Sequence, residues 1–141
     1  MKKLFGLIVI VIVGIGLYQI FRQPPDGKVA PSPLIVRLQA VNGSNLAGQA
    51  KIEENDGQAR VLIELTGAPR EVSQPAFLQR GTCSALGESI YTLSLVIDGA
   101  SETTLTVALA AITDNLPLAV SIYKSATLND NVACGEITTD D

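Results

Sequence analysis

Apolar and polar residues alternate over short segments along most of the chain after residue 33. In residues 34–40, Val36 and Leu38 fall on the face opposite Arg37. A period of two residues is typical of a β-strand with one buried face. The pattern therefore predicts a strand at 34–40.

Further segments of the same kind follow, separated by turn residues such as Asn42-Gly43, Asp56-Gly57 and Asp98-Gly99. About eight short strands with turns roughly every 8–12 residues are typical of an all-β sandwich or barrel. We therefore predict a β-sandwich domain at 34–137, followed by a polar tail at 138–141. The further strands are expected at residues 46–53, 58–66, 90–97, 103–109, 118–124 and 132–137, with a helical turn at 108–113.

The first 22 residues have a different pattern. Lys2 and Lys3 precede an uncharged run at residues 4–21, in which Gln19 is the only clearly polar side chain. As a helix this run would reach about 27 Å, close to the thickness of the hydrocarbon layer of a membrane. The two lysines favour a cytoplasmic N-terminus. We predict a signal-anchor at 1–22 that crosses the membrane once through residues 4–21.

A cleaved signal peptide is the alternative for this segment. The apolar run is longer than is usual for one, and it has no clean site for cleavage after small residues. Both readings place the domain outside the cytoplasm, in the periplasm or in the extracellular space. Residues 23–33 contain four of the seven prolines, which favour an extended chain. This segment is predicted to be a stiff spacer.

The composition argues against two classes of function, histidine-based catalysis and nucleic-acid binding. The chain has no histidine, so it lacks the commonest general base and the commonest metal ligand. From Leu34 onward there are six basic and thirteen acidic side chains, a net charge of −7. Such a domain repels phosphate backbones, and nucleic acid is not an expected partner.

The chain has two cysteines, Cys83 and Cys134, which lie 51 positions apart. Two cysteines outside the cytoplasm normally form a disulfide, and we predict this pair. A catalytic thiol is the alternative, but no histidine is present to activate one and the C-x-x-C spacing is absent.

Three segments resemble Cu/Zn superoxide dismutase-like and CHRD-type domains. Residues 74–83 (QPAFLQRGTC) are similar to the strand that carries a His-x-His copper motif in that family, residues 118–125 to a strand with a later copper histidine, and residues 132–137 (VACGEI) to its C-terminal Ala-Cys-Gly segment. The resemblance implies a Greek-key sandwich of Ig-like architecture and a bond between the cysteines of the first and last segments.

The metal-binding positions of that family are changed in this chain. Phe77 and Gln79 stand at the His-x-His positions, and Tyr123 stands at the later histidine. Copper in such a site needs imidazole nitrogens, and a phenylalanine cannot coordinate a metal. Residues 84–89 are also too few for the family's zinc loop, and Asn131 replaces its substrate-guiding arginine. We expect aromatic packing at these positions, with no cofactor and no catalytic residues.

The sequence therefore predicts a membrane-anchored, extracytoplasmic module that is structural or binds a protein of the envelope or cell surface. A metal-dependent superoxide dismutase-type or redox enzyme of the cell envelope is the alternative. A third interpretation, a subunit of an envelope complex assembled through its anchor helix, stays open.

Overall fold

A computed structural model describes residues 30–127 and 129–139, and these residues form an all-β fold, as the alternating pattern predicts. The described residues from Pro31 onward belong to one compact unit. The described part of the chain contains ten strands and one short helix. Their bounds are β1 Leu34–Ala40, β2 Ala47–Asn55, β3 Gln58–Thr66, β4 Ser73–Gln74, β5 Ala76–Thr82, β6 Ala85–Thr92, β7 Val96–Ile97, β8 Ala100–Leu105, α2 Leu109–Thr113, β9 Leu118–Tyr123 and β10 Asn131–Glu136.

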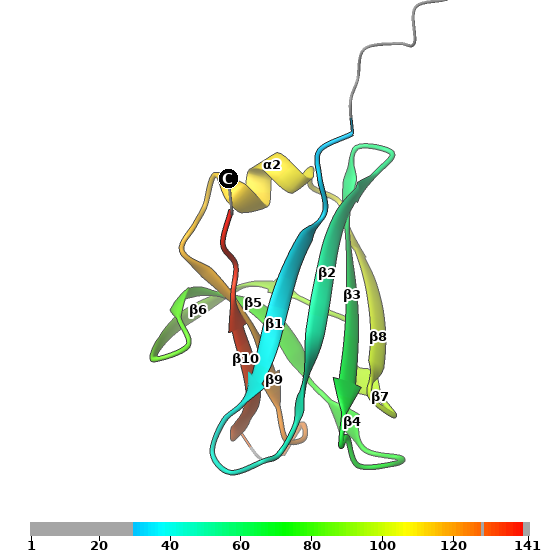
Figure 1. Ribbon diagram of the computed structural model, residues 1–141, viewed down its shortest axis with the longest axis vertical. Coiled ribbons are helices and arrows are strands. Elements are labelled where there is room, and N and C mark those ends of the chain that lie inside the picture. The colour runs from blue at the N-terminus through cyan, green and yellow to red at the C-terminus, as the bar shows by residue number, and fades with distance from the viewer. Residues whose placement is uncertain (1–29, 128, 140–141) are drawn as a thin grey trace, which may run out of the picture. The chain divides into compact units, whose positions relative to one another are not determined.

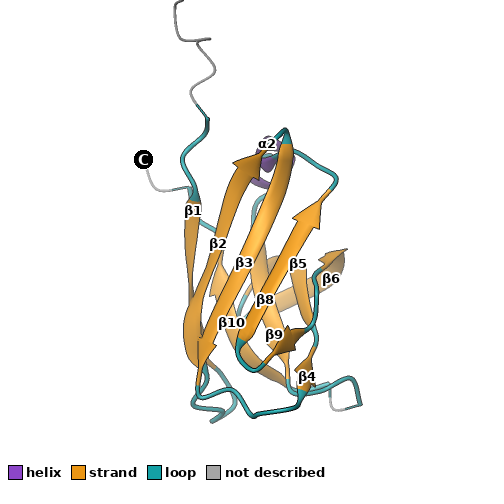
Figure 2. Cartoon of the chain, turned by 90° about the vertical axis from the view of Figure 1, so that its right-hand side faces the viewer, coloured by secondary structure: helices purple, strands orange, loops and turns teal. Residues whose placement is uncertain are grey.

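The ten strands form one antiparallel sheet in the order β4-β7-β8-β3-β2-β1-β10-β9-β5-β6 (Figure 1). The sheet curls so that its two halves face each other (Figure 2). Strand β1 joins the halves, because Leu34–Leu38 pair with β2 while Gln39 and Ala40 pair with β10.

A second connection between the halves lies at Pro75. Strand β4 pairs with β7 in one half, and β5 pairs with β9 and β6 in the other. Only Pro75, which has no N–H to donate to a ladder, separates them. Residues 73–82 therefore run from one half of the curled sheet into the other.

The β2–β3 hairpin shows how the sequence sets the register. Asp56 and Gly57 have φ values of 50° and 77°, the left-handed conformation that a two-residue hairpin turn requires. From this turn, Ala59, Val61 and Ile63 all point into the core and are at most 1% exposed. Leu62, which interrupts the alternation, lies on the outer face.

The core lies between the two halves of the sheet and consists mainly of aliphatic side chains. Its largest fully buried members include Ile52, Leu78, Ile112 and Leu118. Ile112 comes from α2, which lies over one end of the curled sheet (Figures 1 and 2). The Leu109 N–H at the start of α2 donates to Oε2 of Glu54 on β2 at 2.6 Å, which satisfies one of the free amides of the helix terminus.

Some predicted strand bounds were wrong. The strand expected at 90–97 is two strands, β6 and β7, because the chain leaves β5 after Leu93 and joins β8 at Ile97. Leu93 and Val96 are buried on either side of this crossing, so the apolar pattern does not mark it. Strand β6 begins at Ala85, inside the segment 84–89 that was interpreted as a loop. Strand β8 ends at Leu105, earlier than the predicted strand end at 109. The helical turn predicted at 108–113 is present as α2.

None of the helices in residues 30–127 and 129–139 has the length and apolar character needed to span a bilayer. The anchor predicted at 4–21 lies outside the described residues, as does most of the spacer at 23–33.

Candidate functional site

The structure brings together Phe77, Gln79 and Tyr123, the three side chains that the resemblance aligns with metal-binding positions. Phe77 and Gln79 lie on β5, and Tyr123 lies at the end of the neighbouring strand β9. Phe77 and Gln79 alternate with the core residues Ala76 and Leu78, and Tyr123 follows the core residue Ile122, so the three share the outer face of the sheet. All three are half-buried.

Gln79 is the centre of this cluster. Its Oε1 accepts hydrogen bonds from the hydroxyl of Tyr123 at 2.9 Å and from the hydroxyl of Ser121, and its Nε2 donates to the carbonyl oxygen of Gly87 at 3.1 Å. Ser121 is completely buried. The sequence interpretation did not include it, although it lies directly opposite Phe77 in the β5–β9 ladder.

Phe77 and Tyr123 pack edge to face, with ring centroids 5.7 Å apart and an interplanar angle of 73°. This geometry is favourable for two aromatic rings. The hydroxyl of Tyr123 donates to Gln79, while its ring packs against Phe77, so both the polar and the apolar part of this side chain have a partner. The cluster therefore fits packing and does not fit a copper ion, because it offers one occupied amide oxygen and no imidazole. Among the described residues, no three His, Cys, Asp or Glu side chains are grouped as metal ligands would be.

Asn131 lies directly across the β9–β10 ladder from Tyr123. Its Oδ1 is buried and accepts no hydrogen bond from the described residues. A single amide oxygen can accept a hydrogen bond, but it lacks the positive charge of the arginine that the resemblance would place here. The position therefore cannot attract an anion as that arginine would.

Cys83 and Cys134 form a disulfide, with their Cα atoms 5.8 Å apart, and this confirms the predicted pair. Cys83 follows β5 directly, and its N–H donates to Oε1 of Glu136 at 3.0 Å. The bond thus fastens the β5–β6 hairpin to β10. Since both thiols are bonded, the catalytic-thiol alternative has no free sulfur here.

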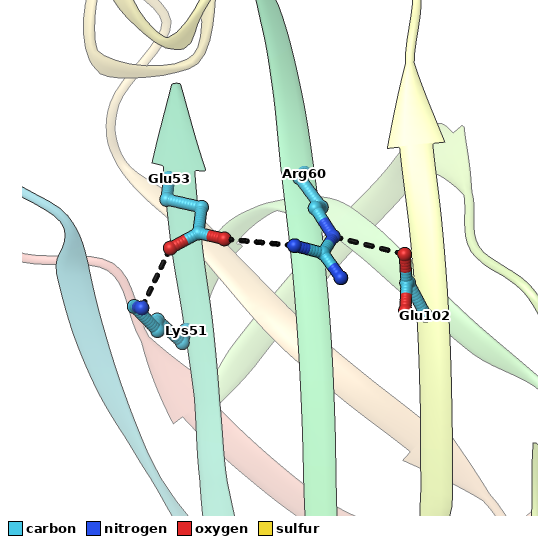
Figure 3. Close-up of polar contacts among 4 residues, drawn as sticks. All are labelled: Lys51, Glu53, Arg60 and Glu102. Atoms are coloured by element: carbon cyan, nitrogen blue, oxygen red, sulfur yellow. Dashed lines mark hydrogen bonds and ion pairs between the residues drawn. The ribbon is translucent and has the colours of Figure 1, made fainter. Parts of the chain in front are cut away.

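A row of charged side chains crosses the outer face of β2, β3 and β8 (Figure 3). Arg60 lies between Glu53 and Glu102, with nitrogen–oxygen distances of 3.2 and 2.9 Å, and Lys51 lies 2.6 Å from Glu53. The hydrogen bond from Lys51 and the charge of Arg60 lower the pKa of Glu53, and the hydrogen bond from Arg60 lowers the pKa of Glu102. The same partners raise the pKa of Arg60. The opposite charges in this exposed row neutralise one another. Such a row is typical of a solvated sheet face, which it stabilises slightly.

A cleft of about 580 Å³ is lined mainly by residues of three loops. These loops are β1–β2, β3–β4 and β9–β10, all at the lower end of Figures 1 and 2. Gln74, Lys124 and Asp130 are among the side chains that line it. The sequence interpretation treated Asn42–Ser44 and Asn129–Asn131 as separate turns and did not connect these loops, because only the fold brings them together.

Comparisons with protein-family models, curated proteins and solved structures found no match.

Proposed function

We propose that the chain is a membrane-anchored, extracytoplasmic module with a structural or protein-binding role and no metal centre of its own. Its framework would be a Greek-key sandwich of the superoxide dismutase-like type, retained after the loss of the metal ligands. The anchor would be the apolar segment at 4–21.

The observation that carries this proposal is the hydrogen-bonded cluster around Gln79. Its Oε1 serves two hydroxyl donors, Ser121 and Tyr123, and Phe77 packs against the tyrosine ring. Both bonds of the Gln79 amide oxygen and one N–H of its amide nitrogen are used within the domain, so this side chain has little left for a substrate or an ion. The face that the resemblance assigns to copper would thus be occupied by the chain's own side chains.

Two further observations support the framework. The Cys83–Cys134 bond joins the segment after β5 to β10, as the resemblance implies. Strand β1 pairs with both halves of the sheet, which suits a sandwich closed at its corners. A disulfide also suits a domain that is exported from the reducing cytoplasm.

The test is a metal and activity measurement on the full-length chain in non-ionic detergent, after exposure to Cu²⁺ and Zn²⁺. The matched control is the triple variant Phe77→His, Gln79→His, Tyr123→His, which returns imidazoles to the three positions. We expect the natural chain to hold less than stoichiometric metal and to be inactive towards superoxide, while the variant gains copper affinity. Stoichiometric metal together with superoxide turnover in the natural chain would refute the proposal and favour the redox enzyme.

The location is tested separately with intact cells or spheroplasts. Protease added from outside should digest the domain and leave an epitope placed at Lys2 and Lys3 protected. A protected domain would contradict an extracytoplasmic position.

A further inference from the structure

We propose that the cleft between the β1–β2, β3–β4 and β9–β10 loops binds a short peptide with free, charged ends, whose amide group pairs with the side chain of Gln74. The inference deepens the proposed binding role and rests on it. It concerns the end of the molecule opposite α2, away from the cluster around Gln79.

The first observation is the state of Gln74. This side chain is only 1% exposed and lines the cleft, yet its amide makes no hydrogen bond with the residues that the structure describes. Among the described residues, Asn131 Oδ1 is the only fully buried side-chain nitrogen or oxygen that lacks a partner, so the unpaired amide of Gln74 reaches the cleft, where a ligand can pair with it. An amide has one acceptor and a donor pair, so its best partner is another amide, which a peptide supplies and a free amino acid does not.

The second observation is a pair of opposite charges beside this amide. Lys124 and Asp130 both line the cleft, and the N–H of Lys124 donates to the carbonyl oxygen of Asp130 at 2.9 Å, so they are neighbours across the β9–β10 loop. None of the ion pairs formed by the described residues involves either of them.

These charges lie close to Gln74. Tyr123, next to Lys124 in the chain, donates its N–H to the carbonyl oxygen of Pro75 at 2.9 Å, and Pro75 follows Gln74 directly. A ligand on Gln74 therefore has a cation and an anion within its reach. A peptide carboxylate matches Lys124 and a peptide ammonium matches Asp130.

The third observation is that the wall of the cleft is held in place. Asn42 Nδ2 donates to the carbonyl oxygen of Asn131 at 2.8 Å, and the Ser44 hydroxyl donates to that of Val132, which ties the β1–β2 loop to β10. Sites for small ligands are usually preformed, at about 300–1,000 Å³, and carry a few placed polar groups. The volume of about 580 Å³ and the mixed lining of this cleft agree with that size.

The experiment is a titration of the full-length, ¹⁵N-labelled chain in non-ionic detergent with trialanine, followed through the side-chain amide signal of Gln74. We expect saturable binding that shifts this signal. Trialanine capped by an acetyl group and a terminal amide lacks both charges and should bind at least about tenfold more weakly.

Three variants locate the contacts. Gln74→Met keeps the size and removes the amide, and it should weaken trialanine binding at least about tenfold. Two forms of trialanine capped at one end separate the charges: Lys124→Gln should weaken binding only of peptides with a free carboxylate, and Asp130→Asn only of peptides with a free ammonium group. Gln49→Met, at an exposed glutamine of β2, is the matched control and should bind normally.

Three results would overturn the inference: no saturable binding at millimolar peptide, equal binding of the capped and free peptides, or full binding by Gln74→Met. A natural chain that is metal-free and inactive but fails these titrations would refute the peptide site alone. A chain that holds metal and turns over superoxide would refute the proposed function instead, so the two failures are distinguishable.

Discussion

Gln74 and Gln79 lie five positions apart on the segment that crosses from one half of the sheet to the other, and their surroundings differ. Gln79 faces outward, and its amide is hydrogen-bonded to Ser121, Tyr123 and Gly87. Gln74 is more deeply buried, at 1% exposure, and its amide meets the cleft without a partner among the described residues.

The comparison shows that burial of a polar side chain has two opposite consequences. Where the partners are present, as around Gln79, the amide organises the packing of its neighbours and adds to stability. Where they are missing, as at Gln74, the amide costs stability and leaves its donors and acceptor open to a ligand. The resemblance to a known family singles out Gln79, whereas only the geometry of the fold singles out Gln74.

The largest expected effect comes from the disulfide. It is formed by Cys83, which directly follows β5, the strand that carries Gln79. Closing a loop of 51 positions stabilises the folded state by about 4 kcal/mol in the chain-entropy model. The double variant Cys83→Ser, Cys134→Ser should therefore lower the Tm by at least several degrees. Calorimetric melts of both forms measure this.

The control is the effect of reductant, which should lower the Tm of the natural chain and leave that of the double variant unchanged. Trialanine binding at Gln74 should persist in the double variant below its lower Tm, because no disulfide holds that end. Equal melting temperatures for the two chains would contradict the stabilising role of the bond.

The next effect tests Gln79. Gln79→Met removes the acceptor that Ser121 and Tyr123 share. The buried Ser121 hydroxyl then keeps only the carbonyl oxygen of Phe77, 3.5 Å away, and a poorly paired buried hydroxyl costs about 1–3 kcal/mol. We expect a loss of about 2 kcal/mol in the free energy of unfolding, measured with urea. Tyr123→Phe, which removes one of the two donors, should cost only about 1 kcal/mol, and the double variant should cost less than the sum. Strict additivity would show that the two side chains do not interact.

The same change at Gln74 should have the opposite sign. Gln74→Met removes an unpartnered buried amide, and we expect a gain of up to about 1 kcal/mol in the free energy of unfolding, by the same urea measurement. A loss as large as that of Gln79→Met would mean that the Gln74 amide has partners in the folded state. In that case the contrast between the two glutamines would fail.

The smallest effect concerns the charged row on the other half of the sheet. The pKa values of Glu53 and Glu102 are lowered from 4.5 in the folded state, so the ionised row stabilises the fold above the ordinary carboxyl pKa. This contribution is lost as the pH falls through the lowered values. The urea midpoints of the natural chain and of Arg60→Met should differ slightly at pH 7 and converge in acid.

Arg37→Met is the control for that comparison, because Arg37 lies on the outer face of β1 and forms no ion pair with the described residues. Its midpoint should follow that of the natural chain at every pH. A gap between the natural chain and Arg60→Met that does not change with pH would show that packing, rather than charge, explains the effect of Arg60.

Much of the fold could be predicted from local patterns. The alternation at Ala59, Val61 and Ile63 and the Asp56-Gly57 turn specify the β2–β3 hairpin, because a period of two and a left-handed turn leave few other arrangements. The crossing at Leu93–Val96 could not be predicted, because its residues are apolar on both sides of the break.

The candidate sites differ in the same way. The altered positions Phe77, Gln79 and Tyr123 could be named because each lies in a segment that resembles a family motif, and the structure brings them together. Ser121 and the cleft could not be named, since they depend on the β5–β9 register and on three distant loops. In the sequence, Gln74 begins the segment that resembles the family strand, but no local pattern marks its side chain as buried.

The most direct measurement follows the side-chain amide signals of both glutamines in one sample of the full-length chain during the trialanine titration. The account predicts that the Gln74 signal shifts and saturates while the Gln79 signal stays in place. A shift of the Gln79 signal alone, or of neither signal, would contradict it, because the open amide would then not be the one at the cleft.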